Sequence, residues 1–149
     1  MDAGDLRARI VAEALGWVGT PWHHMARVKG GGVDCAQLLV GVYSAVGLVP
    51  AIDLGYYPPD WHIHQDVPRF LAMMALHAVP IEGPPLPGDA AMFKFGRHAA
   101  HGAVVTAWPL IVHAFLDERR VVISDAAAHA DLAARFAGFW RLNALTQER

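Results

Sequence analysis

Cysteine is nearly absent from the sequence: Cys35 is the single example among 149 residues. One thiol cannot form an intramolecular disulfide, so the fold does not depend on an oxidising compartment. The sequence also lacks the C-x-x-C pair and the H-E-x-x-H spacing of zinc sites. His62 and His64 could chelate an ion, but a solvated loop is the favoured interpretation, and we expect neither a metal nor another cofactor.

A strong charge of one sign and long hydrophobic runs are absent too. Lysine and arginine together number 12 against 14 acidic residues, which gives a net charge of −2. Because the basic residues form no run, a nucleic-acid or membrane-surface partner is disfavoured. Charged residues interrupt every apolar stretch of residues 1–17, so we expect synthesis in the cytoplasm without a signal peptide or membrane anchor.

What remains is the composition of a globular protein, 54% hydrophobic and 17% charged. With no repeat and no linker-like segment, we expect a single domain over residues 1–149. The first half favours helices: one capped by Asp5, a second that begins at Cys35 and stops at Gly47, and a third that begins near Pro68. The face that the first helix is expected to bury carries Leu6, Ile10, Ala14 and Trp17.

The second half favours strands. Runs rich in β-branched and aromatic residues occur at 90–95, 101–107, 109–115 and 119–124. Their short connections predict antiparallel neighbours. The alanine-rich stretch that follows, 125–137, is expected to be helical, and 138–143 to add a final strand. Helices followed by a strand meander predict an α+β domain.

Cys35 occupies the place where a glycine-rich loop turns into the second helix. Asp34 can act as the N-cap and Gln37 falls three residues later, as in a variant capping box. The sulfur would then lie near unpaired N–H groups at the positive end of the helix dipole, which predicts a lowered thiol pKa and a nucleophile. A buried structural cysteine is the alternative, and the helix alone does not decide between them.

A cysteine nucleophile needs a base, and the base needs a third group that orients it. His101 and His113 lie in successive predicted strands. They share a face directly opposite one another only if paired residue numbers sum to 214, which requires a three-residue turn at 106–108 or a compensating bulge. A two-residue turn at Trp108 and Pro109 would place them on opposite faces.

Four blocks occur in an order typical of a known family: GTPWHHMARVKGGGVDCAQLLVGVYSAVGLVP at 19–50, LPGDAAMF at 86–93, HGAVV at 101–105 and IVHAF at 111–115. Together they resemble the NlpC-type cell-wall cysteine peptidases, and most closely the phage-tail and gene-transfer-agent branch of that family. The segments YYPPDW at 56–61 and FAGFWRL at 136–142 are also similar to that branch, so the resemblance covers most of the chain.

The resemblance implies a papain-like NlpC-type domain, in which N-terminal helices, including the nucleophile helix, pack on an antiparallel sheet. It implies Cys35 as the nucleophile, His101 as the general base and His113 as the residue that orients it. The implied reaction is hydrolysis of a peptidoglycan stem-peptide amide, next to D-glutamyl and diamino-acid residues, through a thioester. The implied setting is a phage-like tail with tail-tip or baseplate proteins as partners, acting in the cell wall or periplasm.

The sequence departs from the family pattern around the nucleophile. Trp22 stands where the family has the tyrosine of G-T-P-Y, and Ala36 and Gln37 stand where serine and glycine are common. Trp22, Asp34 and Trp61 are therefore candidates for the substrate or oxyanion site, while packing of the tryptophans and N-capping by Asp34 are the alternatives.

Other assignments stay open at this point. His98 is a second candidate for the base, although His101 precedes the Gly-Ala-Val run that matches the family pattern. The chain could also be a structural tail-tip component with a weak or inactive peptidase fold, or a thiol amidase or acyltransferase with another substrate.

Overall fold

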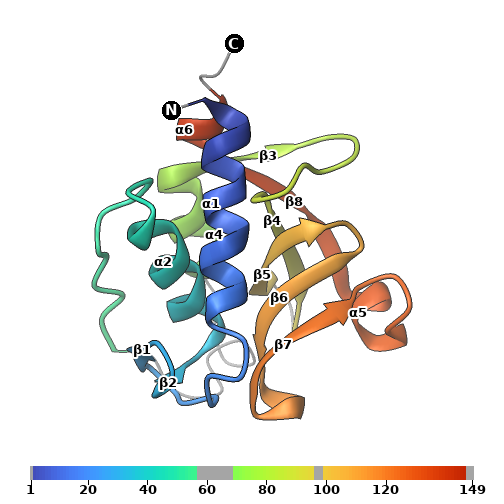
Figure 1. Cartoon of the computed structure of the whole chain (residues 1–149). Coiled ribbons are helices and arrows are strands. Elements are labelled where there is room, and N and C mark those ends of the chain that lie inside the picture. The colour runs from blue at the N-terminus through green and yellow to red at the C-terminus, as the bar shows by residue number, and fades with distance from the viewer. Residues whose placement is uncertain (1, 57–68, 96–98, 147–149) are drawn as a thin grey trace.

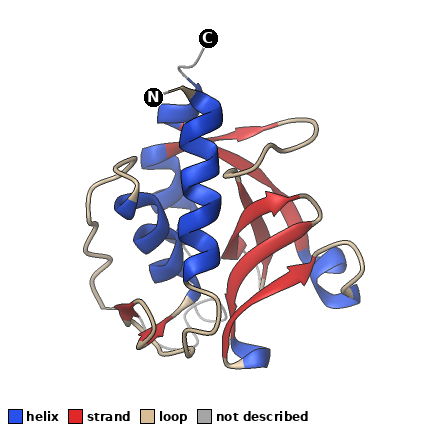
Figure 2. Ribbon diagram, in the orientation of Figure 1, coloured by secondary structure: helices blue, strands red, loops and turns tan. Residues whose placement is uncertain are grey.

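A computed structural model of the chain describes residues 2–56, 69–95 and 99–146. Helices gather on one side of the molecule and a twisted antiparallel sheet on the other, with one short helix beyond the sheet (Figure 1; Figure 2). The helices are α1 (Ala3–Gly16), α2 (Cys35–Ala45), α4 (Arg69–His77), α5 (Ala130–Arg135) and α6 (Asn143–Thr146). The predicted α+β class is confirmed.

Helix α1 packs its apolar face as predicted, but its cap is a different residue. Asp2, not Asp5, is the N-cap, because the extended backbone of Asp2 lets its carboxylate accept a hydrogen bond from the Asp5 N–H at 2.8 Å. Ile10 and Ala14 are fully buried. The periodicity therefore located the helix and its inner face, and the cap expected at Asp5 was wrong.

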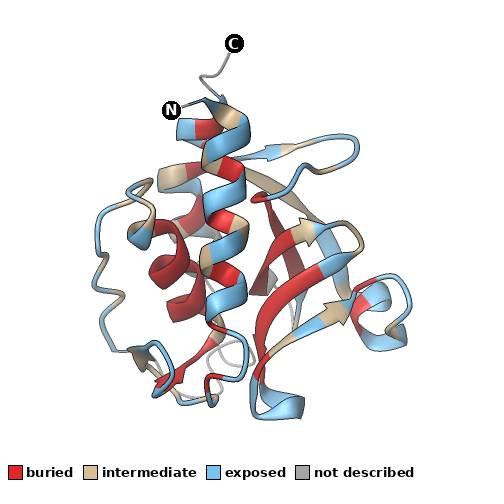
Figure 3. Cartoon of the chain, viewed as in Figure 1, coloured by how far each residue is buried: buried red, intermediate tan, exposed pale blue. Residues whose placement is uncertain are grey.

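Helix α2 begins at Cys35 and ends at Ala45, before Gly47, whose φ of 79° only glycine adopts readily. It is buried almost all round over its first two turns, which makes it the central helix (Figure 3). Helix α4 confirms the third predicted helix. It ends at His77 and gives way to strand β3 (Ala78–Ile81), which the sequence analysis missed.

The four predicted strands of the second half are confirmed as antiparallel neighbours. They are β4 (Ala90–Lys94), β5 (Ala99–Ala107), β6 (Leu110–Phe115) and β7 (Arg120–Asp125). In the described residues the main sheet has the order β3-β8-β4-β5-β6-β7, so the last strand, β8 (Phe136–Leu142), lies between β3 and β4. Shorter elements are the paired strands β1 (Arg27–Val28) and β2 (Gly32–Val33) and the 3₁₀ turn η1 (Leu116–Glu118).

The helix predicted over residues 125–137 is much shorter in the structure. The Asp125 carboxylate accepts hydrogen bonds from the N–H groups of Ala127 and Ala128, so this part of the stretch is a turn. Helix α5 starts only at Ala130, and β8 already begins at Phe136. Alanine content alone did not reveal the turn or the early strand.

The sheet buries both of its faces. Side chains from α1, α2 and α4 pack on one face, against residues that include Met92, Val104 and Val112. The other face carries a second, smaller core that includes Phe93 and Ile111 and is covered in part by Leu132 of α5, whose side chain is fully buried. Because successive side chains of each strand point to opposite faces of the sheet, the two cores are separate.

Candidate active site

Asp34 caps α2 with both of its carboxylate oxygens. Oδ1 accepts the Gln37 N–H at 3.0 Å, and Oδ2 accepts the N–H of Met25 at 2.8 Å. Met25 has a φ of 64°, so the loop before the helix is bent sharply toward the cap. The predicted N-cap is confirmed, and these two hydrogen bonds hold both the loop before Cys35 and the first turn of the helix after it.

The thiol of Cys35 does not have the lowered pKa that the helix start predicts. Burial, followed by the adjacent Asp34 carboxylate, raises the pKa of Cys35 to about 12. The N–H groups of Ala36 and Cys35 act in the expected direction, since they favour the thiolate, but they are outweighed. The prediction was wrong because desolvation at this position depends on tertiary packing.

The Cys35 sulfur also accepts a hydrogen bond from the backbone N–H of Gly102, which lies on β5. Gly102 pairs with Met92, whose side chain belongs to the core under the helices, so position 102 faces α2. Helix α2 accordingly packs against β5. Gly102 directly follows His101 along β5, and the His101 ring itself contacts Phe93 of the smaller core.

His101 and His113 are in direct contact: His101 Nε2 and His113 Nδ1 are 2.8 Å apart. The turn at 108–109 has two residues, yet the histidines share a face, because the β5–β6 register shifts between Val105 and Ala107. Paired residue numbers sum to 216 in Val104 opposite Val112, and not to 214. The two imidazoles are therefore diagonal and not direct neighbours, a separation that aromatic side chains can bridge.

His113 is a neutral residue of the sheet interior. Its side chain is fully buried, and burial, followed by repulsion from His101 and His129, lowers its pKa to about 2. The ring stacks on Phe115 with 4.6 Å between centroids. His113 Nε2 lies 2.9 Å from the hydroxyl oxygen of Ser124 on β7, a partner that the sequence analysis did not identify.

Trp22 is packed rather than extended into solvent. Its ring is partly buried against the main core and stacks with His24 at 6.4 Å between centroids, while its backbone N–H donates to the Arg119 carbonyl. The structure therefore shows packing of this side chain, while its role in the substrate or oxyanion site stays a prediction. Trp61, His62, His64 and His98 lie outside the described residues.

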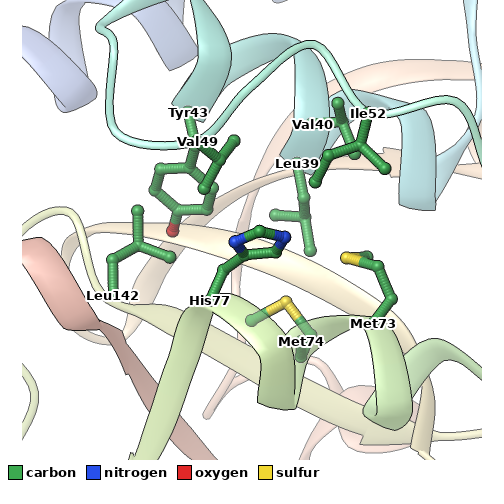
Figure 4. A pocket seen from close by; sticks show the side chains of 9 residues that line it. All are labelled: Leu39, Val40, Tyr43, Val49, Ile52, Met73, Met74, His77 and Leu142. Carbon is green, nitrogen blue, oxygen red and sulfur yellow. The ribbon is translucent and has the colours of Figure 1, made fainter.

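Two of the cavities formed by the described residues lie along α2 and differ in size. The smaller, of about 20 Å³, lies between α2 and α4, and Tyr43 and His77 are the two titratable side chains among its lining residues (Figure 4). It has room for about one water molecule, which excludes a peptide. The larger, of about 360 Å³, is lined by Met25, Arg27, Gln37 and residues 52–55, and it falls in the size range of ligand sites.

Within the described ranges, no group of three or more histidine, cysteine or acidic side chains could hold a metal ion. None of the helices in the same ranges is both long and apolar enough to cross a bilayer.

Comparison with solved structures identifies the fold. The NlpC/p60 domain of the peptidoglycan hydrolase SagA is similar with a TM-score of 0.57 and 19% identity, over 90% of this chain and 96% of that one. An NlpC/p60 family protein from Bacillus cereus matches with a TM-score of 0.66, 18% identity and 91% of this chain. The chain has the NlpC/p60 fold. No protein-family model and no curated protein matches the sequence.

The NlpC/p60 fold of this chain is often one part of a longer protein. The chain spans 39% of the Bacillus cereus protein, and 45% of NlpC1 from Trichomonas vaginalis, to which it is similar with a TM-score of 0.63 and 16% identity over 92% of its own length. The papain-like NlpC-type architecture expected from the ordered sequence blocks is confirmed. Chemically, a thiol at a helix start beside a strand that carries two linked imidazoles is suited to nucleophilic attack on an acyl group.

Proposed function

We propose that the chain is a cysteine-type peptidoglycan hydrolase, with Cys35 as the nucleophile, His101 as the general base and His113 as the residue that orients the base. The observation that carries the proposal is the contact of the Cys35 sulfur with the Gly102 N–H, directly after a histidine that is hydrogen-bonded to a second one. The likeness of the fold to the SagA domain supports the cell wall as the target.

The reaction begins with a neutral thiol, since the pKa of Cys35 is raised to about 12. As the sulfur attacks the amide carbonyl carbon, His101 takes the thiol proton, and the Cys35 N–H stabilises the oxyanion. The His101 imidazolium then protonates the leaving amine while the C–N bond breaks, leaving a thioester. Water attacks the thioester, its proton passes to His101, and the proton returns to the departing thiolate as the acid product leaves.

The proposed substrate is the peptide stem of peptidoglycan, cut between D-glutamyl and diamino-acid residues. The cavity of about 360 Å³ beside the first turn of α2 offers a place for a charged stem, because Arg27 and Asp53 both line it. The sequence resemblance to the gene-transfer-agent branch supports a further element of the proposal, which is carriage on a phage-like tail that opens the wall locally.

The test of the activity is digestion of purified peptidoglycan by the wild type and by Cys35→Ala, with the released fragments identified by mass spectrometry. New stem-peptide termini made only by the wild type are the expected result, and their masses name the bond. His101→Ala should lose turnover and His98→Ala should keep it. If the wild type binds the wall without releasing fragments, the chain is a binding module and the hydrolase proposal fails.

Carriage on a tail is tested separately. Mass spectrometry of purified phage-like particles from producing cells should find the chain at a fixed stoichiometry to tail-tip or baseplate proteins. Recovery of the protein in the lysate alone, with none in the particles, would contradict this part of the proposal and leave the hydrolase activity unaffected.

A further inference from the structure

The two imidazoles of the candidate site continue into a third side chain. His113 Nδ1 lies 2.8 Å from His101 Nε2, and His113 Nε2 lies 2.9 Å from the Ser124 hydroxyl oxygen. The β6–β7 register pairs Ile111 with Ser124, so the serine is diagonal to His113, as His113 is to His101. A chain of hydrogen bonds therefore crosses β5, β6 and β7 on one face of the sheet.

A neutral imidazole carries one N–H donor and one acceptor nitrogen. His113 is fully buried, and since its pKa is lowered to about 2 it stays neutral near pH 7. Only one of its two hydrogen bonds can therefore use its own proton. If the proton is on Nε2, His113 donates to Ser124 and accepts from His101; if it is on Nδ1, His113 donates to His101 and Ser124 must donate to it.

The proposed chemistry needs the first of these two states. While His101 receives the thiol proton on one nitrogen, its Nε2 must keep a proton, and that N–H needs an acceptor. His113 Nδ1 is an acceptor only in the Nε2–H tautomer. In the other tautomer, His101 Nε2 accepts a hydrogen bond from His113. A neutral His101 then carries its proton on Nδ1, so Nδ1 cannot accept the thiol proton.

We propose that Ser124 is a positioning residue, whose hydroxyl accepts the Nε2–H of His113 and so holds that ring in the tautomer from which it can accept the His101 N–H. The catalytic consequence rests on the proposed function. Stacking on Phe115 fixes the plane of the His113 ring, but it does not choose which nitrogen carries the proton. The Ser124 hydroxyl supplies the acceptor that the Nε2–H tautomer requires, and its removal leaves that N–H without this partner.

The test reads the tautomer directly by ¹⁵N NMR of histidine-labelled protein, with the His113 signals assigned by their loss in His113→Asn. In the wild type we expect the Nε2–H tautomer. Ser124→Ala should move the signals toward Nδ1–H, because a buried N–H without an acceptor is unfavourable. Ser124→Thr, which keeps the hydroxyl, should restore the wild-type signals. Ser44→Ala is the matched control, since its hydroxyl bonds the Gly41 carbonyl on α2.

Kinetics supply the second readout. Ser124→Ala should lower kcat about tenfold with KM nearly unchanged, and Ser124→Thr should recover it. An Nδ1–H tautomer in the wild type, or an unchanged tautomer in Ser124→Ala, would overturn the inference. The wild-type spectrum decides the first point even if the alanine variant fails to fold. Absence of peptidoglycan turnover with the expected tautomers would refute the hydrolase proposal and support the assignment of the Ser124 hydrogen bond.

Discussion

At the scale of single residues, the surroundings of Cys35 shift the pKa of its thiol in opposite directions. Burial and the neighbouring Asp34 carboxylate raise its pKa, while three backbone N–H groups lower it, and the balance puts the pKa at about 12. A helix start is therefore not sufficient for a thiolate when the sulfur is desolvated beside a negative charge. In the proposed reaction the thiol therefore loses its proton during the attack and not before it.

This balance predicts slow alkylation of Cys35 near neutral pH. The rate constant for iodoacetamide should rise by about tenfold per pH unit through pH 8 to 10, since only the thiolate reacts. Asp34→Asn keeps a capping side chain but removes the charge, so it should lower the pKa and speed alkylation at a fixed pH. A wild-type rate that reaches its plateau near pH 7 would contradict this account.

Because the pKa of the buried His113 is lowered, we expect the folded protein to lose stability in acid. Its pKa is about 2 in the folded protein and 6.5 for the ordinary side chain, so below pH 6.5 the unfolded chain binds a proton that the folded chain excludes. The free energy of unfolding should therefore fall as the pH drops from 6.5, by about 2 kcal/mol at pH 5 from this residue. Urea unfolding at several pH values measures the slope.

The control for that slope is His113→Asn, which removes the titrating group from both states. Its unfolding free energy should depend less steeply on pH between 6.5 and 5 than that of the wild type. If the unfolding free energies of the two proteins depend equally on pH, His113 either binds a proton in the folded state or is shielded from protonation in the unfolded chain.

Part of this site could be predicted from the sequence. The cap at Asp34 and the helix start at Cys35 depend on local hydrogen bonds, which the order of residue types determines. The pKa of Cys35 could not be predicted, because its burial is set by strands far along the chain. The link to Ser124 was missed because it requires the registers of two strand pairs, one of which contains a bulge.

At the scale of elements, Asp89 connects a helix to two strands. Its fully buried carboxylate binds Arg7 of α1 at 3.0 Å and Arg141 of β8 at 2.8 and 3.0 Å, and accepts the Leu86 N–H. Burial opposes the charge, but the hydrogen bonds from Arg141, Leu86 and Arg7 outweigh it and lower the pKa of Asp89. The Asp89 carboxylate thus orders the turn at 86–89 and also joins α1 to the sheet.

Removal of this carboxylate should destabilise the protein strongly. Asp89→Ala leaves two guanidinium groups without their partner, and we expect the free energy of unfolding to fall by about 3–5 kcal/mol. Asp131→Ala, which breaks the exposed ion pair with Arg135, should change it by no more than about 0.5 kcal/mol. Urea unfolding of both variants provides the measurement. If the two variants lose equally little unfolding free energy, Asp89 does not stabilise the contact between α1 and the sheet.

The order of the strands shows where local patterns stop being informative. Four strands joined by short turns were predicted as neighbours and lie so in the sheet. Strand β8 was expected at the end of the chain, but its place between β3 and β4 is a long-range pairing that no local pattern encodes. Strand β3 was missed because it follows α4 without an intervening loop.

At the scale of the whole molecule, a helix carries the proposed nucleophile, and the sheet carries the proposed base and the side chains hydrogen-bonded to it. Helix α2 lies in the core with its start beside β5, and the histidines and Ser124 follow one another across β5, β6 and β7. The ordered sequence blocks predicted the NlpC-type fold, but not the hydrogen bond to Ser124. Identities of 16–19% to similar structures are too low to carry an activity, which therefore has to be measured.

The most direct measurement is the initial rate at which stem-peptide termini appear in purified peptidoglycan, compared for the wild type and Cys35→Ala at equal concentration and equal thermal stability. If the thiol is the nucleophile, the variant should be slower by about a thousandfold or more. A Cys35→Ala protein that releases the same termini at the wild-type rate would contradict the central claim that this chain cuts peptidoglycan through Cys35.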